Sequence, residues 1–576
     1  MKQPDLELLS TKLSSTKLSM SQAESSASLA GAVAQVGGGT LLSRLLGFAR
    51  DFLIARLFGA SQATDAFFVA FRLPNMMRRL FAEGAFAAAL IPALTRTGGQ
   101  GCDPHEARRK LISEFAGSLT ALLLLITGLG LLAAPVLVWL LAPGFSADGQ
   151  QLQLTSALLR LTLPYLLFIG LTALAGAVLN SLEHFAVPAL TPALLNLSLI
   201  GCALLLAPRL EQPVFALAWG VLFGGLAQLA LQLAALARLG LLVTPSISWH
   251  NPELARLLAA MGPTLIGMSV TQINLLLDTL LASFLLAGSI SWLYYAERLM
   301  DFPLGILGAA LGTAILPRLT RIHATGRSDD FNTTLDWALR WVLLLGLPAA
   351  TGLLLLAEPM IATLFSSDHF DAADVHQTSR ALMAYALGLP FFMAYKVIAP
   401  GFFSRNDLTT PLRIGLISLA TNLVLSVLLM RPFGHAGLAL ATSVATALGV
   451  GLLLRAMLRA QHAKLRPGWS GLLLRSALGT AVMALLIAWI VTRMPVSRDP
   501  GFADGILPLT GLILVGASVY PLTLIVLGFR GKHVRPERQP CALPTPADQD
   551  SNSRADQARP RDEQSWPEPT RSRPSL

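Results

Sequence analysis

Long apolar runs separated by short polar stretches fill the chain from about residue 30 to residue 530. A helix needs about 20 mostly apolar residues to cross the roughly 30 Å hydrocarbon layer of a bilayer. The pattern therefore predicts an all-α protein with fourteen membrane-spanning helices, at residues 30–58, 66–95, 112–142, 156–180, 186–207, 214–237, 257–287, 291–317, 334–357, 379–404, 409–430, 436–457, 470–492 and 506–529. The first, second, seventh and eighth spans are the least apolar of the fourteen.

Basic residues in the loops predict the orientation. Arg and Lys are frequent in one set of connections, at 96–110, 238, 318–327, 405 and 459–466. The opposite set has fewer, and its largest loop, 358–380, is rich in acids. Because basic loops stay inside, both termini are predicted to be cytoplasmic. Residues 1–29 have no apolar run typical of a signal peptide, and 531–576 have the composition of a disordered tail.

The overall composition excludes several classes of protein. The chain of 576 residues is 53% hydrophobic and 13% charged, whereas a soluble protein carries about 25% charged residues. A soluble multi-domain enzyme is excluded, and the long apolar runs also exclude a transmembrane β-barrel. The net charge of +10 fits basic loops on one membrane face rather than nucleic-acid binding. The three cysteines are too scattered for a disulfide framework or a zinc site.

A weak internal repeat predicts the architecture. Residues 67–96 align without a gap to residues 292–321, and both segments end in Leu-Thr-Arg. The two copies lie six predicted spans apart, which keeps their orientation the same and predicts a parallel repeat. We therefore expect two six-helix lobes, at 30–240 and 250–460, followed by an additional helix pair at 468–530. Two lobes that meet on a pseudo-twofold axis predict a central cavity, as in alternating-access transporters.

Charged residues occur inside the predicted spans of both repeat copies. They are Arg44, Arg50, Asp51, Arg56, Asp65, Arg72, Arg78, Arg79, Glu83, Asp278, Glu297, Arg298 and Asp301. Each charge at the bilayer centre costs about 2.5–3.5 kcal/mol, so these residues are expected to face a wet cavity or to pair with one another inside the bundle. For single residues such as Arg56, a position at a helix end or in a salt bridge is the alternative. Arg160 and Lys396 stand alone and are predicted to be structural or interfacial.

Arginine indicates the kind of substrate. Its planar fork binds two phosphate oxygens at once and keeps its charge at every relevant pH. Several arginines around one cavity therefore predict an anionic substrate with phosphate or diphosphate groups. Pro74 disturbs the phase of the second span, so helical geometry does not choose between Arg78 and Arg79. In the second lobe, Asp278, Asn422 and Thr442 form either an oxygen-lined site for a monovalent coupling cation or a polar packing cluster.

Two segments carry a resemblance to a known family. SRLLGFARDFLIARLFGASQATDAFFVAFRLPNMMRRLFAEGAFAAALIPALTR (43–96) and WLYYAERLMDFPLGILGAALGTAILPRLTR (292–321) resemble the MurJ (MviN) family of lipid II flippases. The similarity covers about residues 30–530. The family belongs to the multidrug/oligosaccharidyl-lipid/polysaccharide (MOP) exporter superfamily.

The resemblance implies a transporter rather than an enzyme. It would move lipid II, the undecaprenyl-diphosphate-linked precursor of peptidoglycan, from the inner to the outer leaflet of the bacterial cytoplasmic membrane. Membrane lipids and proteins of cell-wall synthesis would be its neighbours, and no cofactor is implied beyond a possible coupling cation. The matching positions are Arg44, Arg50, Asp51, Asp65, Arg78 and Arg298, with Arg79 adjacent, and Glu297 stands where many relatives have Asp.

Two alternatives remain at this point. One is another exporter of the same superfamily, for a different lipid-oligosaccharide or for drugs; a drug and cation antiporter would favour acids in the cavity. The other is an intramembrane enzyme that acts on polyprenyl phosphates. Such an enzyme needs an acid–base or metal-binding cluster, for which 365–374 is the nearest candidate.

Overall fold

A computed structural model describes residues 37–80, 104–147, 149–247, 272–324, 328–459, 466–493 and 502–530. The tails predicted at 1–29 and 531–576, and Glu83 in the second span, lie outside the described residues. The described chain is helical, and its only bridge of β type joins Ser367 and Phe370 within one loop.

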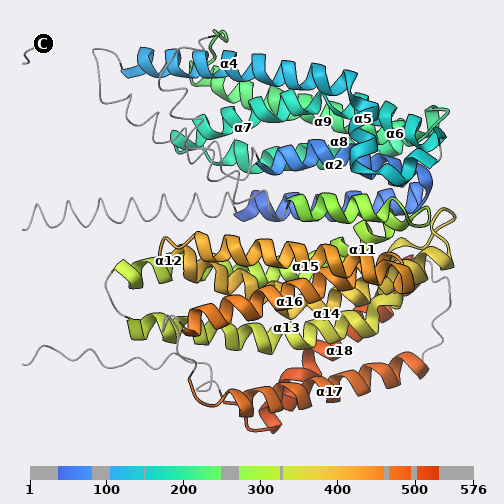
Figure 1. Cartoon of the computed structure of the whole chain (residues 1–576), viewed down its shortest axis with the longest axis vertical. Coiled ribbons are helices and arrows are strands. Elements are labelled where there is room, and N and C mark those ends of the chain that lie inside the picture. Colours follow the sequence, from blue (N-terminus) through green and yellow to red (C-terminus); the bar gives the residue numbers. More distant parts are fainter. Residues whose placement is uncertain are drawn as a thin grey trace, which may run out of the picture. The chain divides into compact units, whose positions relative to one another are not determined.

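The first half of the chain forms one group of helices (Figure 1). Its elements are a helix over 37–58, α2 (Gln62–Leu80), α4 (Pro104–Leu132), α5 (Ala134–Leu141), the 3₁₀ turn η2 (Pro143–Ala147), α6 (Gly149–Thr162), α7 (Tyr165–Ser181), α8 (Ala186–Leu205), η3 (Ala207–Arg209) and α9 (Phe215–Arg238). Within this group α9 packs against α8, α7 and α6, and α2 packs against α6.

The second half forms a second group (Figure 1). It comprises a helix Gln272–Ala282, α11 (Ser289–Pro303), the π-helical turn η4 (Leu304–Gly308), α12 (Ala309–Ala324), α13 (Ser328–Phe365), α14 (Ala372–Phe403), α15 (Thr409–Phe433) and α16 (His435–Arg459). Here α14 packs against α11, α13 and α16. The last pair, α17 (Trp469–Arg493) and α18 (Phe502–Val526), packs on α13.

Ten helical segments of the described residues are long and apolar enough to cross a membrane, with α6 and α7 counted together as one segment, Gly149–Ser181. They coincide with the third to sixth and the ninth to fourteenth predicted spans. The other four predicted spans correspond to helix 37–58, α2, the shorter helix Gln272–Ala282, and α11–α12. These four spans contain the charged residues that the sequence analysis found in the two repeat copies and just upstream of them. The all-helical membrane fold is confirmed, whereas the count of fourteen stays a prediction.

Proline and local unwinding interrupt three spans that the sequence pattern presented as continuous. The third divides into α4 and α5 just before Pro135, and the fourth divides into α6 and α7 at Pro164. The eighth passes through η4 directly after Pro303. Proline lacks the N–H that a helix interior requires, and π-helical turns commonly accompany functional sites.

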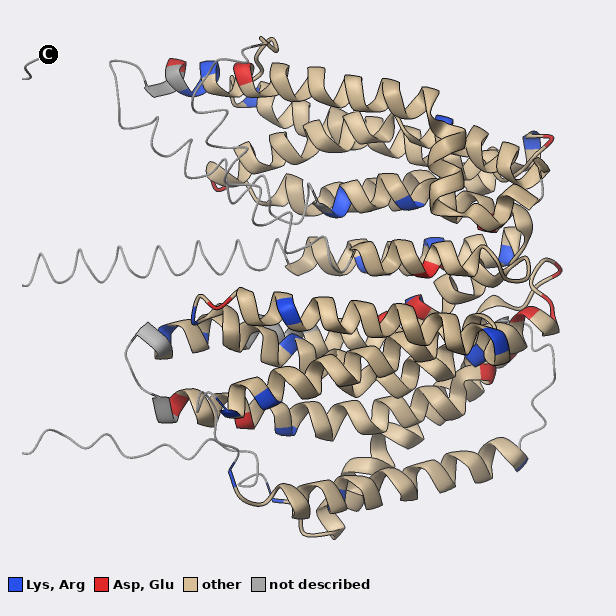
Figure 2. Cartoon of the chain, in the orientation of Figure 1, with Lys and Arg blue, Asp and Glu red and all other residues tan. Residues whose placement is uncertain are grey.

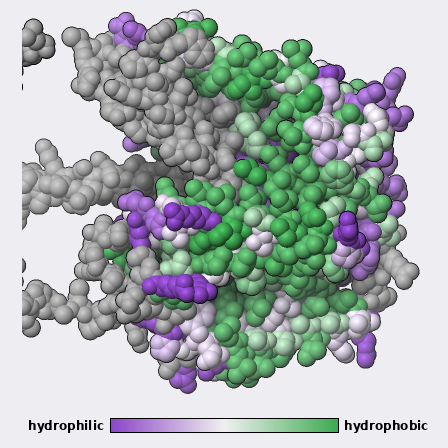
Figure 3. All heavy atoms as spheres, in the orientation of Figure 1, coloured by the Kyte–Doolittle hydropathy of each residue, from purple (hydrophilic) through white to green (hydrophobic). Residues whose placement is uncertain are grey.

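The exterior matches a lipid environment. Figure 3 shows large apolar areas on the face in view, and side chains such as Leu132 (83% exposed) and Val526 (85% exposed) project from the helices. Figure 2 shows long stretches of helix without Lys, Arg, Asp or Glu; many of the charged residues lie toward helix ends, and others lie midway along the central helices. Apolar exposure on this scale is typical of a membrane-facing surface.

Candidate functional site: an arginine-rich cavity

A cavity of about 1140 Å³ is lined by helix 37–58, α2, helix Gln272–Ala282 and α11, with contributions from further helices of both groups. Its charged lining residues are Arg44, Arg50, Asp51, Arg72, Arg78, Arg79, Asp278, Glu297, Arg298, Asp301 and Lys396. Seven of these side chains are cationic and four are acidic. The structure therefore brings together all of the predicted substrate-binding residues except Asp65, in a cavity with positive net charge.

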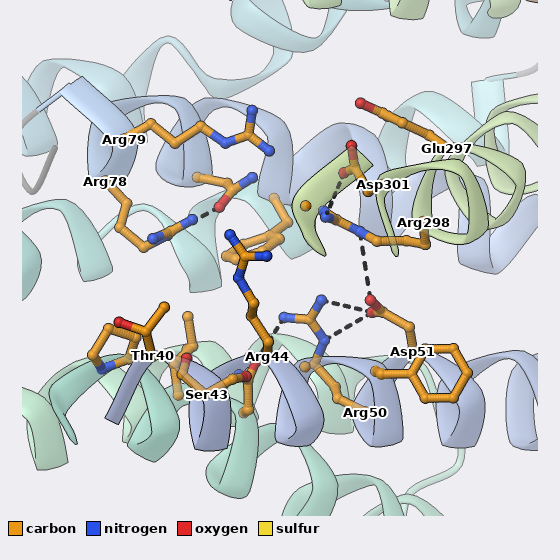
Figure 4. Close-up of a pocket in the computed structure, with 18 of the residues that line it drawn as sticks. Thr40, Ser43, Arg44, Arg50, Asp51, Arg78, Arg79, Glu297, Arg298 and Asp301 are labelled. Atoms are coloured by element: carbon orange, nitrogen blue, oxygen red, sulfur yellow. Dashed lines mark hydrogen bonds and ion pairs between the residues drawn. The ribbon is translucent and has the colours of Figure 1, made fainter. Parts of the chain in front are cut away.

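Asp51 is the centre of a network between the two helix groups. Arg50 approaches its Oδ1 to 2.6 Å, and the Tyr294 hydroxyl donates to the same oxygen at 2.9 Å. Arg298, on α11, lies 3.5 Å from the second oxygen, Oδ2. The Arg50 and Asp51 side chains are 12% and 5% exposed. Figure 4 shows the arginines of both groups converging on the Asp51 carboxylate.

Arg50 is also held by neutral partners. It donates to Asn196 on α8 at 3.0 Å and to the Tyr294 hydroxyl at 2.9 Å, and Asn196 in turn donates to the Ser43 carbonyl. A guanidinium carries five donors in a fixed fork. These contacts therefore fix its plane and its position at the cavity wall.

The other predicted arginines occupy the same space from different elements. Arg78 donates from Nε to Asn75 at 3.1 Å. Arg44 extends from helix 37–58 toward the centre of the cavity (Figure 4), and its guanidinium would be touched by a Cβ added to Gly305 in η4. Arg79 lines the cavity beside Arg78. The geometry thus retains both Arg78 and Arg79, between which the helical pattern could not choose.

Asp65 does not line the cavity. It is 2% exposed, and its carboxylate accepts from the backbone N–H groups of Gly288 and Ser291 at 2.7 and 2.8 Å and from the Ser291 hydroxyl at 2.6 Å. Asp65 therefore caps the N-terminus of α11 across the two helix groups, where unpaired N–H groups favour an anion. The helical periodicity of the sequence correctly predicted that Asp65 and Arg72 share a face of α2. Only Arg72 lines the cavity, because Asp65 lies further along the helix, at the N-terminus of α11.

Further contacts join the same ends of the two groups. The Tyr295 hydroxyl donates to the Gly59 carbonyl at 3.2 Å, and Ser367 donates to the Arg56 carbonyl at 2.9 Å. Gly59 has φ +66°, and a Cβ there would overlap the His369 carbonyl. We call the contacts made by Arg56, Gly59, Asp65, Gly288, Ser291, Tyr295 and Ser367 the closed end. The cavity lies on the other side of it and reaches Gly37 and Arg79.

Arg72 and Lys396 take on roles that the sequence pattern did not assign. Arg72, on α2, donates to the Thr279 hydroxyl at 2.8 Å and to the Leu275 carbonyl at 3.3 Å on helix Gln272–Ala282. It therefore joins the two helix groups inside the cavity. Lys396, on α14, was expected to be structural or interfacial; it lines the cavity beside η4.

The structure brings Asp278, Asn422 and Thr442 together, as the sequence predicted. The Asn422 amide donates to Asp278 Oδ1 at 3.2 Å, and Thr442 donates to Asn422 Oδ1 at 3.3 Å. Asn274 joins the cluster by donating to Asp278 Oδ2 at 3.3 Å. One turn along α15 from Asn422, the buried Ser426 hydroxyl has no hydrogen-bond partner among the described residues. The contacts in this cluster are hydrogen bonds between polar side chains, and its carboxylate, amide and hydroxyl oxygens are of the kind that bind hard cations.

Tyr294 is the residue that the sequence analysis missed. Its ring stacks on Phe68 with centroids 4.0 Å apart, the Arg298 guanidinium lies 4.9 Å from its centroid, and its hydroxyl contacts Arg50 and Asp51. The sequence could have indicated Tyr294, because it precedes Arg298 by four residues and therefore lies on the same helix face.

Two arginines lie away from the cavity, as expected. Arg56 packs its guanidinium over the Phe52 ring at 5.4 Å. Arg160 donates weakly, at 3.4 Å, to the Leu131 carbonyl in an exposed position. Neither lines the cavity.

Comparisons with known proteins identify the family of the chain. A family model described as lipid II flippase MurJ matches residues 54–503. A probable lipid II flippase MurJ of Vibrio cholerae is 43% identical over 505 residues, which cover 86% of this chain and 95% of that protein. The lipid II flippase MurJ of Burkholderia cenocepacia is 38% identical over 511 residues, covering 88% of this chain and 98% of the relative.

Solved structures show the same fold. A lipid II flippase MurJ in an inward closed conformation matches with a TM-score of 0.73 and 26% identity, over 87% of this chain and 99% of the other. An inward-facing multidrug resistance MATE transporter of the MOP superfamily matches with a TM-score of 0.63 and 14% identity, over 75% of this chain and 98% of the other. The cavity, the fold and the extent of these matches lead to one assignment: the chain belongs to the MurJ family of lipid II flippases.

Proposed function

We propose that this protein moves lipid II from the inner to the outer leaflet of the bacterial cytoplasmic membrane by alternating access. The observation that carries the proposal is the cavity in which Arg44, Arg50, Arg78, Arg79 and Arg298 gather between two helix groups. Family membership supports lipid II as the substrate, because the curated relatives are named for it.

The physical obstacle to flipping is the polar head. A diphosphate that carries sugars and a peptide cannot cross hydrocarbon without losing its hydration, which costs many kcal/mol. A cavity with fixed guanidinium groups replaces lost water contacts with bidentate hydrogen bonds. In this account Arg50, Arg78 and Arg298 bind the diphosphate, with Arg44 and Arg79 close by. The prenyl chain stays in the lipid outside the bundle.

Alternating access requires that the cavity be sealed on one side. The positive-inside orientation would put the closed end at the periplasmic face and the cavity mouth at the cytoplasmic face, where a precursor made in the cell would enter. No bond is made or broken, so the protein acts as a transporter and not as an enzyme. The membrane potential, negative inside, favours outward movement of an anion by about 2.3 kcal/mol per charge per 100 mV.

The balance of charge favours an anionic substrate over cationic drugs. A cavity for cationic drugs would be expected to hold an excess of acids, whereas here seven cationic side chains face four acids. The direct test is complementation of a bacterial strain depleted of its own lipid II flippase, with membrane abundance measured in parallel. Growth is expected with this chain. Failure to grow at normal abundance would contradict the proposed function.

The orientation gives a separate prediction. A reporter fused after Arg530 should behave as cytoplasmic, and one inserted between Phe365 and Ala372, in the loop joining α13 to α14, should behave as periplasmic. Alkaline phosphatase and fluorescent-protein fusions measure this. A periplasmic result for both reporters would show that the chain crosses the membrane an even number of times after this loop, instead of the five times expected for α14 to α18.

We also propose that the Asp278 cluster binds a monovalent cation that resets the carrier. Asp278→Asn keeps the size of the side chain but removes the charge that attracts the ion. Flipping in proteoliposomes should lose its dependence on a sodium or proton gradient, while binding of a polyprenyl diphosphate to the cavity should remain. Thr446→Ala, one turn beyond Thr442 on α16, is the matched control. An unchanged ion dependence in the Asp278→Asn protein would leave the cluster as polar packing.

A further inference from the structure

The cavity already contains an anion that occupies its arginines. Asp51 binds Arg50 at 2.6 Å and lies 3.5 Å from Arg298. These are two of the three arginines assigned above to the diphosphate. A phosphate oxygen therefore competes with the Asp51 carboxylate for the fork of Arg50, where Asp51 takes Nε and Nη2, and for the charge of Arg298, which Asp51 contacts through Nε. A guanidinium has five N–H donors. In Arg50 these groups already donate to Asp51, Asn196 and Tyr294.

We propose that Asp51 is the internal competitor of the substrate anion, and that Tyr294 keeps Asp51 hydrogen-bonded after the arginines turn to the diphosphate. The proposal rests on the proposed function above. In the empty cavity Asp51 neutralises arginines that would otherwise repel one another. When the substrate enters, the arginines leave Asp51 and bind the diphosphate. When the substrate is released, Asp51 binds the arginines again, and this lets the strongly charged head leave the cavity.

The Asp51 carboxylate is buried, so the loss of its arginine partners is costly unless another group still donates a hydrogen bond to it. Asp51 is 3% exposed, and a buried carboxylate without donors is strongly destabilised. The Tyr294 hydroxyl donates to Asp51 Oδ1 at 2.9 Å. Because the hydroxyl is neutral, the phosphate attracts it less strongly than it attracts the arginines, so it stays with Asp51. Its ring is fixed by stacking on Phe68. Tyr294 is therefore a positioning residue, which acts on the substrate through Asp51.

The proposal predicts opposite effects of two small substitutions. Asp51→Asn removes the competing charge, so a detergent-solubilised short-chain polyprenyl diphosphate should bind about tenfold more tightly. Flipping should slow, because release of the head loses the anion that recaptures the arginines. Tyr294→Phe removes only the hydroxyl. Because Asp51 depends on that hydroxyl more in the bound state than in the empty state, binding should weaken about tenfold.

Asp301 provides a matched control. It lies at the same 3.5 Å from Arg298, but its side chain is 42% exposed against 5% for Asp51. Asp301→Asn removes the same charge from the same cavity, yet water screens that carboxylate. Its effect on affinity should be only about twofold, in line with exposed ion pairs. A comparison of the two Asn variants separates competition at the arginines from a general change in cavity charge.

Binding of the polyprenyl diphosphate to purified full-length protein, by native mass spectrometry or thermophoresis, is the measurement, with thermal unfolding as a check on folding. Tighter binding by Asp51→Asn together with weaker binding by Tyr294→Phe supports the proposal. Wild-type binding with unchanged or weaker binding by Asp51→Asn overturns it. If Asp51→Asn does not fold, Tyr294→Phe decides alone, and wild-type affinity in that variant contradicts the proposal. A wild-type protein that binds no polyprenyl diphosphate contradicts the proposed function instead.

Discussion

Replacing Arg50, Arg78 or Arg298 by alanine is expected to abolish growth of a strain that depends on this chain for lipid II flipping. Each substitution removes a charge-assisted, bidentate contact to the diphosphate and should lower substrate affinity on the order of 10- to 100-fold. The protein should remain in the membrane, because all three side chains face a cavity rather than a packed core. Complementation with abundance measured on immunoblots tests this.

Lysine variants and two control arginines sharpen the result. Lysine keeps the charge but loses the fork, so it should restore activity only in part. Arg56→Ala and Arg160→Ala should support growth, since Arg56 packs on Phe52 and Arg160 is exposed, both away from the cavity. Growth of the three cavity variants at normal abundance would contradict the arginine clamp. Their loss from the membrane would show instead that the arginines are needed for folding.

Replacing Asp65 by alanine is expected to open the closed end. The substitution removes three hydrogen bonds between α2 and the start of α11 and leaves two buried N–H groups unpaired. Each unpaired group costs about 1–3 kcal/mol, so the equilibrium should shift at least tenfold toward separated ends. Flipping should fall because the carrier no longer returns to the state that loads from the cytoplasm.

Cross-linking across the closed end measures that shift. Ser367 donates to the Arg56 carbonyl at 2.9 Å, so cysteines at positions 56 and 367 should be joined by a short thiol reagent. The background would lack Cys102, Cys202 and Cys541. Asp65→Ala should lower the yield strongly, whereas Ser291→Ala, which removes one of the three bonds, should lower it only modestly. An unchanged yield in Asp65→Ala would mean that the closed end does not depend on this cap.

The sequence was most informative for features that one large free-energy contribution determines, such as the cost of placing charge in lipid. Insertion into lipid penalises charge so strongly that Arg44, Arg50 and Arg298 together predicted a polar cavity, and the structure places all three on the cavity wall. The ten strongly apolar spans follow from hydropathy alone. Asp278, Asn422 and Thr442 were grouped as polar residues in spans of the same lobe, and the structure brings them together.

Features that depend on depth and on partners from the other helix group were not predictable. Asp65 and Arg72 share a face of α2, yet one caps α11 at the closed end and the other lines the cavity. That difference depends on where α11 begins, which is a property of packing. Tyr294 was overlooked because aromatic residues are ordinary in membrane helices, and only its contacts with Arg50, Asp51 and Arg298 distinguish it.

The most direct test of the account is the amount of lipid II exposed at the outer leaflet of cells depleted of their own flippase. An externally added enzyme that cleaves lipid II but does not cross the membrane reports this amount. With the intact chain, most lipid II should become accessible, and with Arg298→Ala at equal abundance it should remain protected inside. Protected lipid II with the intact chain, or full exposure with Arg298→Ala, would contradict the claim that the arginine-lined cavity carries lipid II across the membrane.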